Sequence, residues 1–160
     1  MREISKPREP SSKEGGSSLF IKCQSQALLY LSMREHNRKE LILKLKTKGY
    51  ESDLIDSVLD SLEEDGSLSE DRYVRSFIRS SNKRHPEGKL LMARRLAAKG
   101  ADRETASRVL SEVYTEEYIR ALVSQARADI IRKGKAKTEE EIRFSLKKIG
   151  FSDKDIRFDD

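Results

Sequence analysis

The chain has 160 residues, with 33 Lys and Arg against 28 Asp and Glu, 36% hydrophobic residues and one Cys. Its length fits about one ordinary domain, and its longest apolar run, the five residues 27–31, is too short to cross a bilayer. No apolar segment follows the basic N-terminus, and the lone Cys23 excludes an internal disulfide and a multi-cysteine zinc site. We therefore expect a water-soluble, cytoplasmic protein that does not associate with membranes.

The first 17 residues have the composition of a disordered tail. They hold two of the three prolines and a run of Ser and Gly, so they cannot bury enough apolar surface to offset the entropy of ordering. Helical periodicity begins after them. One face of a first helix, expected to end near His36, carries Phe20, Gln24, Ala27, Leu28 and Leu31.

Capping residues mark the helices that follow. Asn37 and Glu40 have the spacing of a capping box at the start of a second helix, and Gly49 fits its end. A third helix ends at Gly66, a fourth starts near Ser69, and a fifth follows, with Met92, Ala93, Leu96 and Ala97 expected to face inward. No segment alternates with a period of two, so we predict an all-α protein.

An internal repeat recurs about every 50 residues. Glycines lie 51 and 50 residues apart, and each has a leucine four residues earlier: Gly49, Gly100 and Gly150, with Leu45, Leu96 and Leu146. Such self-similarity predicts stacked units that bury their apolar faces against one another. We expect one domain over residues 18–160, built from three three-helix repeats (18–66, 67–113 and 114–160) that form an elongated, curved helical solenoid.

Charge is divided along the sequence. Residues 51–71 contain nine acids and no Lys or Arg, whereas residues 72–103 contain ten bases and two acids. This separation favours a charged partner, either a nucleic acid or a protein with complementary patches. Charged helix faces that only contact water would give the same pattern.

Groups for catalysis are scarce. Only His36 and His85 titrate near neutral pH, and each lies at a predicted helix boundary, where a solvated or capping histidine is the commoner case. Cys23 fits a small core residue better than a nucleophile, and adjacent acid pairs such as Glu63-Glu64 do not face a shared metal. We predict neither enzyme activity nor a metal or organic cofactor.

The basic residues of the middle repeat predict a binding surface. Opposite the apolar face of the fourth helix lies a cationic ridge, which continues through the fifth helix: Arg72, Arg75, Arg79, Lys83, Arg84, Lys89, Arg94, Arg95 and Lys99. A secondary basic cluster ends the seventh helix: Arg127, Arg132, Lys133, Lys135 and Lys137. The ridge could contact phosphates without sequence preference, or dock on an acidic protein surface. The aromatic residues Tyr73 and Phe77 are expected to point to the core, which weakens a base-stacking interpretation.

Several sequence segments resemble the RecX family, whose members regulate the RecA recombinase. The matching segments are residues 34–41 with Leu45, Lys48 and Gly49; residues 66–74 with Phe77 and Ile78; and Gly88, Leu96, Lys99 and Gly100. The likeness covers about residues 20–158. It implies a non-catalytic, helical-repeat protein, expected to be a monomer, that binds the RecA–DNA filament and mainly inhibits RecA ATPase and strand exchange in DNA repair and the SOS response. Direct contact with DNA is also implied for some members. The alternative from the residues alone is a stand-alone, largely sequence-independent DNA-binding protein.

Overall fold

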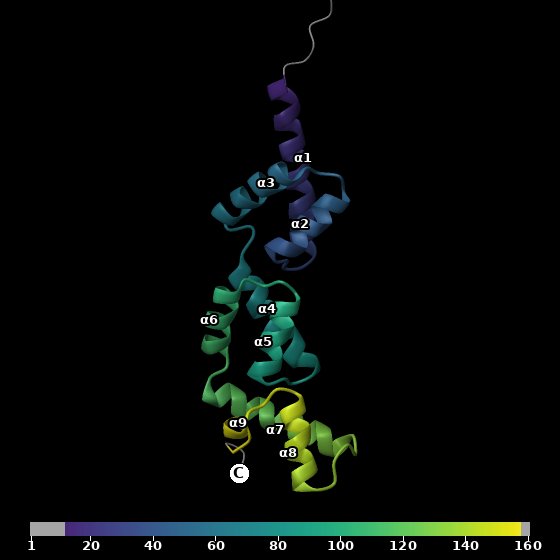
Figure 1. Cartoon of the computed structure of the whole chain (residues 1–160), viewed down its shortest axis with the longest axis vertical. Helices are drawn as coiled ribbons and strands as arrows, with labels where there is room; N and C mark the ends of the chain where they lie inside the picture. Colours follow the sequence, from purple (N-terminus) through teal and green to yellow (C-terminus); the bar gives the residue numbers. More distant parts are fainter. Residues whose placement is uncertain (1–11, 158–160) are drawn as a thin grey trace, which may run out of the picture.

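A computed structural model of the protein describes residues 12–157, and every regular element within them is a helix (Figure 1). This confirms the all-α prediction. The helices in chain order are α1 (Ser12–Met33), α2 (Arg38–Thr47), α3 (Ser52–Glu64), α4 (Glu70–Arg84), α5 (Lys89–Ala98), α6 (Arg103–Val113), α7 (Glu116–Arg132), α8 (Glu139–Lys148) and α9 (Asp153–Arg157).

The helices pack in three consecutive groups of three. We call α1–α3 unit 1, α4–α6 unit 2 and α7–α9 unit 3, because each helix makes its main contacts within its own group. The units follow one another along the long axis of the molecule, from α1 at one end to α8 and α9 at the other (Figure 1). The molecule is therefore elongated, as a tandem repeat of short helices requires.

Side-chain caps fix where most helices begin. Asn37 accepts a hydrogen bond from the Glu40 amide and Ser69 accepts one from the Arg72 amide. Glu40 does not complete the predicted capping box by returning to Asn37; it forms an ion pair with Arg34 at 3.0 Å. The glycines that follow α2, α5 and α8 all have positive φ, the left-handed conformation that ends a helix without steric cost to glycine.

The first helix starts earlier than the sequence predicted. Residues 12–17 were assigned to a disordered tail, but α1 begins at Ser12; residues 1–11 of that tail lie outside the described residues. Cys23 and Ala27 are fully buried against the other helices of unit 1, so the central part of α1 is held in place. Adding residues to an established helix is far easier than nucleating one, which allows helix to continue through the exposed Gly15 and Gly16.

Two separate hydrophobic cores hold the units together. The core of unit 1 contains Cys23, Ala27, Leu41, Leu45, Ile55, Val58, Leu59, Leu62 and Leu68. The second core runs without interruption through units 2 and 3, from Tyr73 and Val74 on α4 to Leu146, Phe151 and Ile156 near the C-terminus. Ala93 and Ala97, expected to face inward, are exposed instead.

Neighbouring units meet at equivalent positions. In each joint, the residue that caps the start of the middle helix of one unit donates a hydrogen bond to the carbonyl at the end of the middle helix of the next. Asn37 Nδ2 donates to the Lys99 carbonyl at 3.0 Å, and the Gly88 amide donates to the Ile149 carbonyl at 2.8 Å. The units are thus stacked by one repeated contact, with a side chain as donor at the first joint and backbone as donor at the second.

Candidate binding surface

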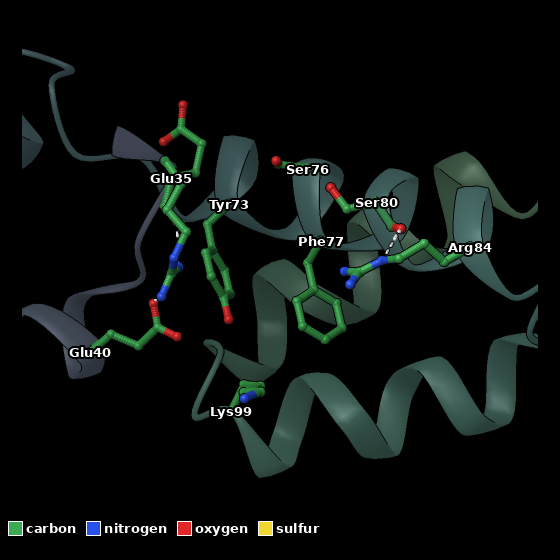
Figure 2. A pocket seen from close by; sticks show the side chains of 9 residues that line it. Glu35, Glu40, Tyr73, Ser76, Phe77, Ser80, Arg84 and Lys99 are labelled. Atoms are coloured by element: carbon green, nitrogen blue, oxygen red, sulfur yellow. Dashed lines mark hydrogen bonds and ion pairs between the residues drawn. The ribbon is translucent and has the colours of Figure 1, made fainter. Parts of the chain in front are cut away.

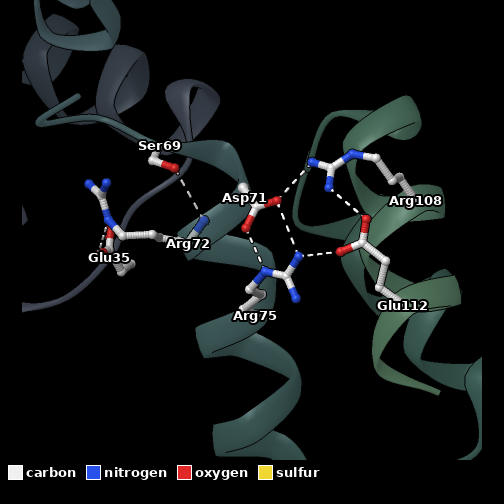
Figure 3. Close-up of polar contacts among 7 residues, drawn as sticks. All are labelled: Glu35, Ser69, Asp71, Arg72, Arg75, Arg108 and Glu112. Carbon is white, nitrogen blue, oxygen red and sulfur yellow. Dashed lines mark hydrogen bonds and ion pairs between the residues drawn. The ribbon is translucent and has the colours of Figure 1, made fainter. Parts of the chain in front are cut away.

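The cationic ridge predicted along α4 is interrupted by ion pairs (Figure 3). Arg75 Nε lies 2.6 Å from Asp71 Oδ2, and the same guanidinium also contacts the Glu112 carboxylate on α6. Arg108 of α6 contacts Asp71 at 2.7 Å and Glu112 at 3.0 Å. Two arginines and two carboxylates therefore form a balanced cluster that joins α4 to α6, and Arg75 is not an open part of a continuous ridge.

The hydrogen bonds in this cluster favour the charged form of every member. Arg75 and then Arg108 hold the pKa of Asp71 below its usual range, and the same two guanidinium groups lower the pKa of Glu112. Part of this cluster can be predicted from the sequence, because Asp71 and Arg75 are four residues apart on one helix. Glu112 could not be predicted as a partner, because it is 37 residues from Arg75.

Two further arginines of the predicted ridge also have acidic partners. Arg72 Nε donates to Glu35 at 2.9 Å, and this ion pair bridges units 1 and 2. Arg95 contacts Glu87 at 2.6 Å. Both pairs are partly exposed, so they direct packing more than they add stability. They also reduce the positive charge that the middle unit offers to a partner.

Six cations of the predicted ridge make no ion pair within the described part of the chain. We call them the open cations: Arg79, Lys83, Arg84, Lys89, Arg94 and Lys99. They do not share one face. Arg79 and Lys83 line a cavity between α4 and α7, whereas Arg84 and Lys99 line a cleft between units 1 and 2. The open residues of the predicted ridge therefore line separate surfaces, and their part in binding stays a prediction.

The cleft beside α4 combines open cations with hydroxyl groups (Figure 2). It has a volume of about 250 Å³, and the hydroxyls of Ser76 and Ser80 lie on the side of α4 that also carries Arg84. Arg84 Nε donates to the Ser80 carbonyl at 3.3 Å, and Lys99 comes from the end of α5. This half of the cleft offers positive charge and hydrogen-bond donors, the groups that bind phosphate or carboxylate.

The other half of the cleft is acidic and aromatic. Glu35 and Glu40 approach from unit 1 together with Arg34, which pairs with Glu40 at 3.0 Å, and the Tyr73 ring lies between this group and Arg84 (Figure 2). Burial, followed by the nearby charge of Glu40, raises the pKa of the Tyr73 phenol to about 12, so the phenol stays protonated. Phe77, expected in the core, is only partly buried, and the Arg95 guanidinium lies 5.2 Å from its ring centroid. This arrangement is a cation–π contact, and the same guanidinium is neutralised by its ion pair with Glu87.

The secondary basic cluster loses its arginines to ion pairs in the same way. Arg127 contacts Glu139 at 2.7 Å, and Arg132 contacts Asp129 at 2.6 Å. Lys133, Lys135 and Lys137 are exposed and make no ion pair in the described part of the chain. Three lysines near the end of α7 therefore remain from the five predicted residues.

The acidic stretch is partly neutralised within unit 1. Arg38, at the start of α2, contacts three carboxylates of α3: Asp56 at 3.3 Å, Asp60 at 2.8 Å and Glu63 at 3.0 Å. These contacts join α2 to α3 and neutralise part of the negative charge of residues 51–71. α3 nevertheless remains an acidic helix, since it contains no Lys or Arg and one guanidinium cannot balance three acids.

The candidate catalytic residues of the sequence are spread over the molecule. Cys23 is buried in the unit 1 core, and burial raises the pKa of its thiol. His36 was expected to be solvated or to cap a helix, but it is 1% exposed, and its ring centroid lies 6.1 Å from that of the Tyr30 ring. His85, which follows α4, is exposed. Within residues 12–157 no cluster of His, Cys, Asp and Glu could hold a metal ion, and no helix is long and apolar enough to span a bilayer.

Known proteins resemble this chain in sequence and in the arrangement of its helices. A family model described as RecX, first three-helix domain, matches residues 23–62, most of unit 1. The regulatory protein RecX of Pseudomonas fluorescens (strain SBW25) is 38% identical over 93 residues. The crystal structure of RecX from Lactobacillus salivarius aligns with a TM-score of 0.74 and 25% identity, over 88% of this chain and 94% of that chain. The chain is therefore similar to RecX proteins in both sequence and fold.

Other RecX proteins extend the likeness along the chain. The regulatory protein RecX of Pelodictyon phaeoclathratiforme is 28% identical over 131 residues, which cover 82% of each protein. A second crystal structure of regulatory protein RecX, 18% identical, has a TM-score of 0.73 over 96% of this chain and shares its fold. The match to the Pseudomonas fluorescens relative spans 58% of this chain and 59% of the relative. These RecX relatives are named as regulatory proteins, not as enzymes.

Proposed function

We propose that the protein binds the nucleoprotein filament of the RecA recombinase and mainly inhibits RecA ATPase and strand exchange during DNA repair and the SOS response. Its similarity to RecX proteins, which are named as regulatory proteins, supports a regulatory role. The observation that carries the proposal is the set of open cations on unit 2, together with the acidic helix α3 on the same elongated molecule. A filament of protein and DNA presents both anionic phosphates and charged protein surfaces.

The cleft between units 1 and 2 is the proposed contact for the anionic part of the filament. Arg84 lies on α4 beside the hydroxyls of Ser76 and Ser80, and Lys99 enters the cleft from the end of α5 on the opposite side (Figure 2). Neither cation has a carboxylate partner within the described residues, so an incoming anion does not have to break an ion pair there. Lys133, Lys135 and Lys137 supply a second, more distant contact in unit 3.

The test is a titration of the protein into RecA assembled on single-stranded DNA, with ATP hydrolysis and strand exchange as readouts. We expect both activities to fall at near-stoichiometric protein. Replacing Arg84→Glu together with Lys99→Glu is expected to raise the concentration needed for inhibition about tenfold or more, because two attractive charges become repulsive. RecA activities that stay unchanged over the full wild-type titration would exclude the regulatory role.

A matched control separates the cleft from overall charge. Lys46→Glu changes an exposed lysine on α2, outside the cleft, and is expected to leave inhibition close to that of the wild-type protein. If Lys46→Glu weakens inhibition as much per charge as the cleft variant, the effect reflects net charge alone. Circular dichroism of each variant verifies that the helices are retained.

Binding to bare DNA is the second candidate, favoured by the donors and the partly exposed Phe77 ring of the same cleft. Affinity for a single-stranded oligonucleotide should then fall steeply with salt. The slope of log K against log salt changes by roughly 0.7 for each phosphate contact on a single strand, so loss of two contacts should reduce it by about 1.4. Strong binding to filaments with no binding to bare DNA would exclude this candidate.

A further inference from the structure

An open apolar groove lies between α5 and α6, outside the cleft already described. Its volume is about 490 Å³. Six apolar side chains line it: Leu90, Ala93, Ala97, Ala101, Ala106 and Leu110. Leu90 is 58% exposed, and Ala93 and Ala97 are also exposed, so apolar surface here faces water. Contiguous exposed apolar surface of this kind marks interaction sites.

The groove exists because unit 2 has small residues where the other repeats have large ones. After the helix-ending glycine, unit 2 has Ala101, whereas unit 1 has Tyr50 and unit 3 has Phe151. Tyr50 packs on the unit 1 core and Phe151 is 2% exposed in the second core. The middle repeat therefore lacks an aromatic ring that its two neighbours both use.

Two further equivalent positions also have a smaller side chain in unit 2. Ala106 of α6 corresponds to Ile55 in unit 1 and Ile156 in unit 3, and both isoleucines are buried. On α5, Ala93 stands where unit 1 has Ile42. Three reductions in side-chain size thus open one continuous hollow, shaped to receive an apolar ring from outside.

The charge around the groove is positive. None of the residues that line it is acidic, and two are cations: Lys89 at the start of α5 and Arg103 at the start of α6. Lys89 Nζ is held by the Ser111 hydroxyl at 3.2 Å, and Arg94, exposed on α5, is another open cation. Two carboxylates, Asp102 and Glu104, line the neighbouring hollow beside Arg103, and Asp102 caps α6 by accepting a hydrogen bond from the Thr105 amide.

We infer that this groove is a docking site for an acidic protein segment that inserts one aromatic side chain. The ring would occupy the space that Tyr50 and Phe151 fill in the neighbouring repeats, and flanking carboxylates would face Lys89 and Arg103. An aliphatic hollow suits a buried ring, whereas it offers no aromatic partner for stacking a nucleic-acid base. A protein segment is therefore the occupant that the groove favours.

The test uses a short synthetic peptide with one phenylalanine flanked on both sides by glutamates. It is titrated into the ¹⁵N-labelled full-length protein and followed by NMR. We expect amide shifts to concentrate on α5, Ala101 and α6. A matched peptide with alanine in place of phenylalanine should bind at least about tenfold more weakly, because a buried ring supplies most of the apolar contact. The titration contains neither RecA nor DNA, so its result is independent of the proposed function.

Filling the groove provides the decisive variant. Ala101→Tyr places an aromatic residue where the other two repeats have one, and it should weaken peptide binding about tenfold or more. Ala121→Tyr adds the same ring at an exposed site on α7 and should leave binding unchanged. If Ala101→Tyr proves poorly folded, Ala93→Ile fills the same groove from the exposed side of α5 and carries the same expectation.

Three outcomes would overturn the inference. The first is peptide binding that does not change in either groove-filling variant. The second is displacement of the peptide by a thymidine oligonucleotide at equal concentration, which would make the groove a nucleic-acid contact. The third is wild-type self-association in sedimentation experiments that Ala101→Tyr abolishes, which would make the occupant a second copy of the chain.

Discussion

The two joints between units use equivalent positions but different chemistry. At the joint between units 1 and 2, polar side chains dominate: Asn37 donates to the Lys99 carbonyl, and Arg72 pairs with Glu35. At the joint between units 2 and 3, the Gly88 backbone contacts the next unit directly, and one apolar core continues through both units. The same repeat therefore produces a polar connection on one side of unit 2 and an apolar connection on the other.

This difference predicts two levels of cooperativity. In repeat proteins, stability is divided between individual units and the interfaces between neighbours. Unit 1 has its own core, so it can open without exposing the core of the rest. Units 2 and 3 share a core, so opening either one exposes apolar surface of the other. The molecule should behave as one independent unit joined to a cooperative pair.

The largest expected effect comes from equivalent leucines, all fully buried: Leu45, Leu96 and Leu146. Replacing each with alanine should cost about 2–5 kcal/mol, because a cavity is left in a packed core. Leu45→Ala should lower hydrogen-exchange protection in unit 1 alone, whereas Leu96→Ala and Leu146→Ala should each lower it in units 2 and 3 together. Mass spectrometry of exchanged peptides measures this unit by unit. Loss of protection confined to unit 2 in Leu96→Ala would show that the shared core is not cooperative.

A smaller loss of stability is expected when a side-chain atom is added at the tight backbone contact of the second joint. Gly88 has φ of −72°, which any residue can adopt, but an added Cβ would lie 2.1 Å from the Gly150 carbonyl carbon. Gly88→Ala should therefore destabilise units 2 and 3 by about 1–3 kcal/mol through overpacking. Urea unfolding provides the measurement.

The first joint offers a matched comparison for Gly88. At Gly100 an added Cβ would meet the flexible Lys39 side chain at 2.4 Å, and φ is +78°. At Gly66 φ is +79° and no atom lies within 4 Å, so Gly66→Ala measures the cost of φ alone. We expect Gly100→Ala to cost about as much as Gly66→Ala. A much larger cost at Gly100 would mean that the polar joint is as rigid as the apolar one.

Asn37 should have the next largest effect, confined to the first joint. It is 0% exposed; its side chain accepts from the Glu40 amide at 2.7 Å and donates to the Lys99 carbonyl. Asn37→Ala should cost about 1–2 kcal/mol, since a helix cap is lost, while Asn37→Ser keeps the cap and removes only the contact with Lys99. The distribution of distances between spin labels on units 1 and 2 should broaden in both variants. Equal broadening between units 2 and 3 would contradict the separation of the joints.

The smallest expected effect is a pH dependence confined to unit 1. Burial lowers the pKa of His36, so the folded protein binds fewer protons than the unfolded chain once the pH falls below about 6.5. Unit 1 should therefore lose stability as the pH falls below about 6.5, and His36→Gln should remove that loss. Burial raises the pKa of Glu70, which gives the opposite slope, so the difference between wild-type and His36→Gln protein isolates the histidine. Equal slopes in both proteins would contradict this assignment.

The caps and the repeat were readable in the sequence because they depend on neighbouring residues. Asn37, Ser69 and the three repeat glycines act within one turn of their own helix, and the structure places them as predicted. The repeat of Leu45, Leu96 and Leu146 likewise identified three equivalent buried positions. The start of α1 was misplaced, since composition describes a segment in isolation and not one that extends a packed helix.

The sequence by itself determined the helices, their repeat and the total charge, because these depend on local spacing and residue type. Only the tertiary structure decided which charges face solvent. Glu35 and Glu112 each lie 37 residues from their arginine partners, and no local sequence pattern predicts an ion pair at that separation. Folding also decided that Ala93 and Ala97 line an open groove, since an alanine is small enough for either side of a helix. Burial and ion pairing arise where distant segments meet.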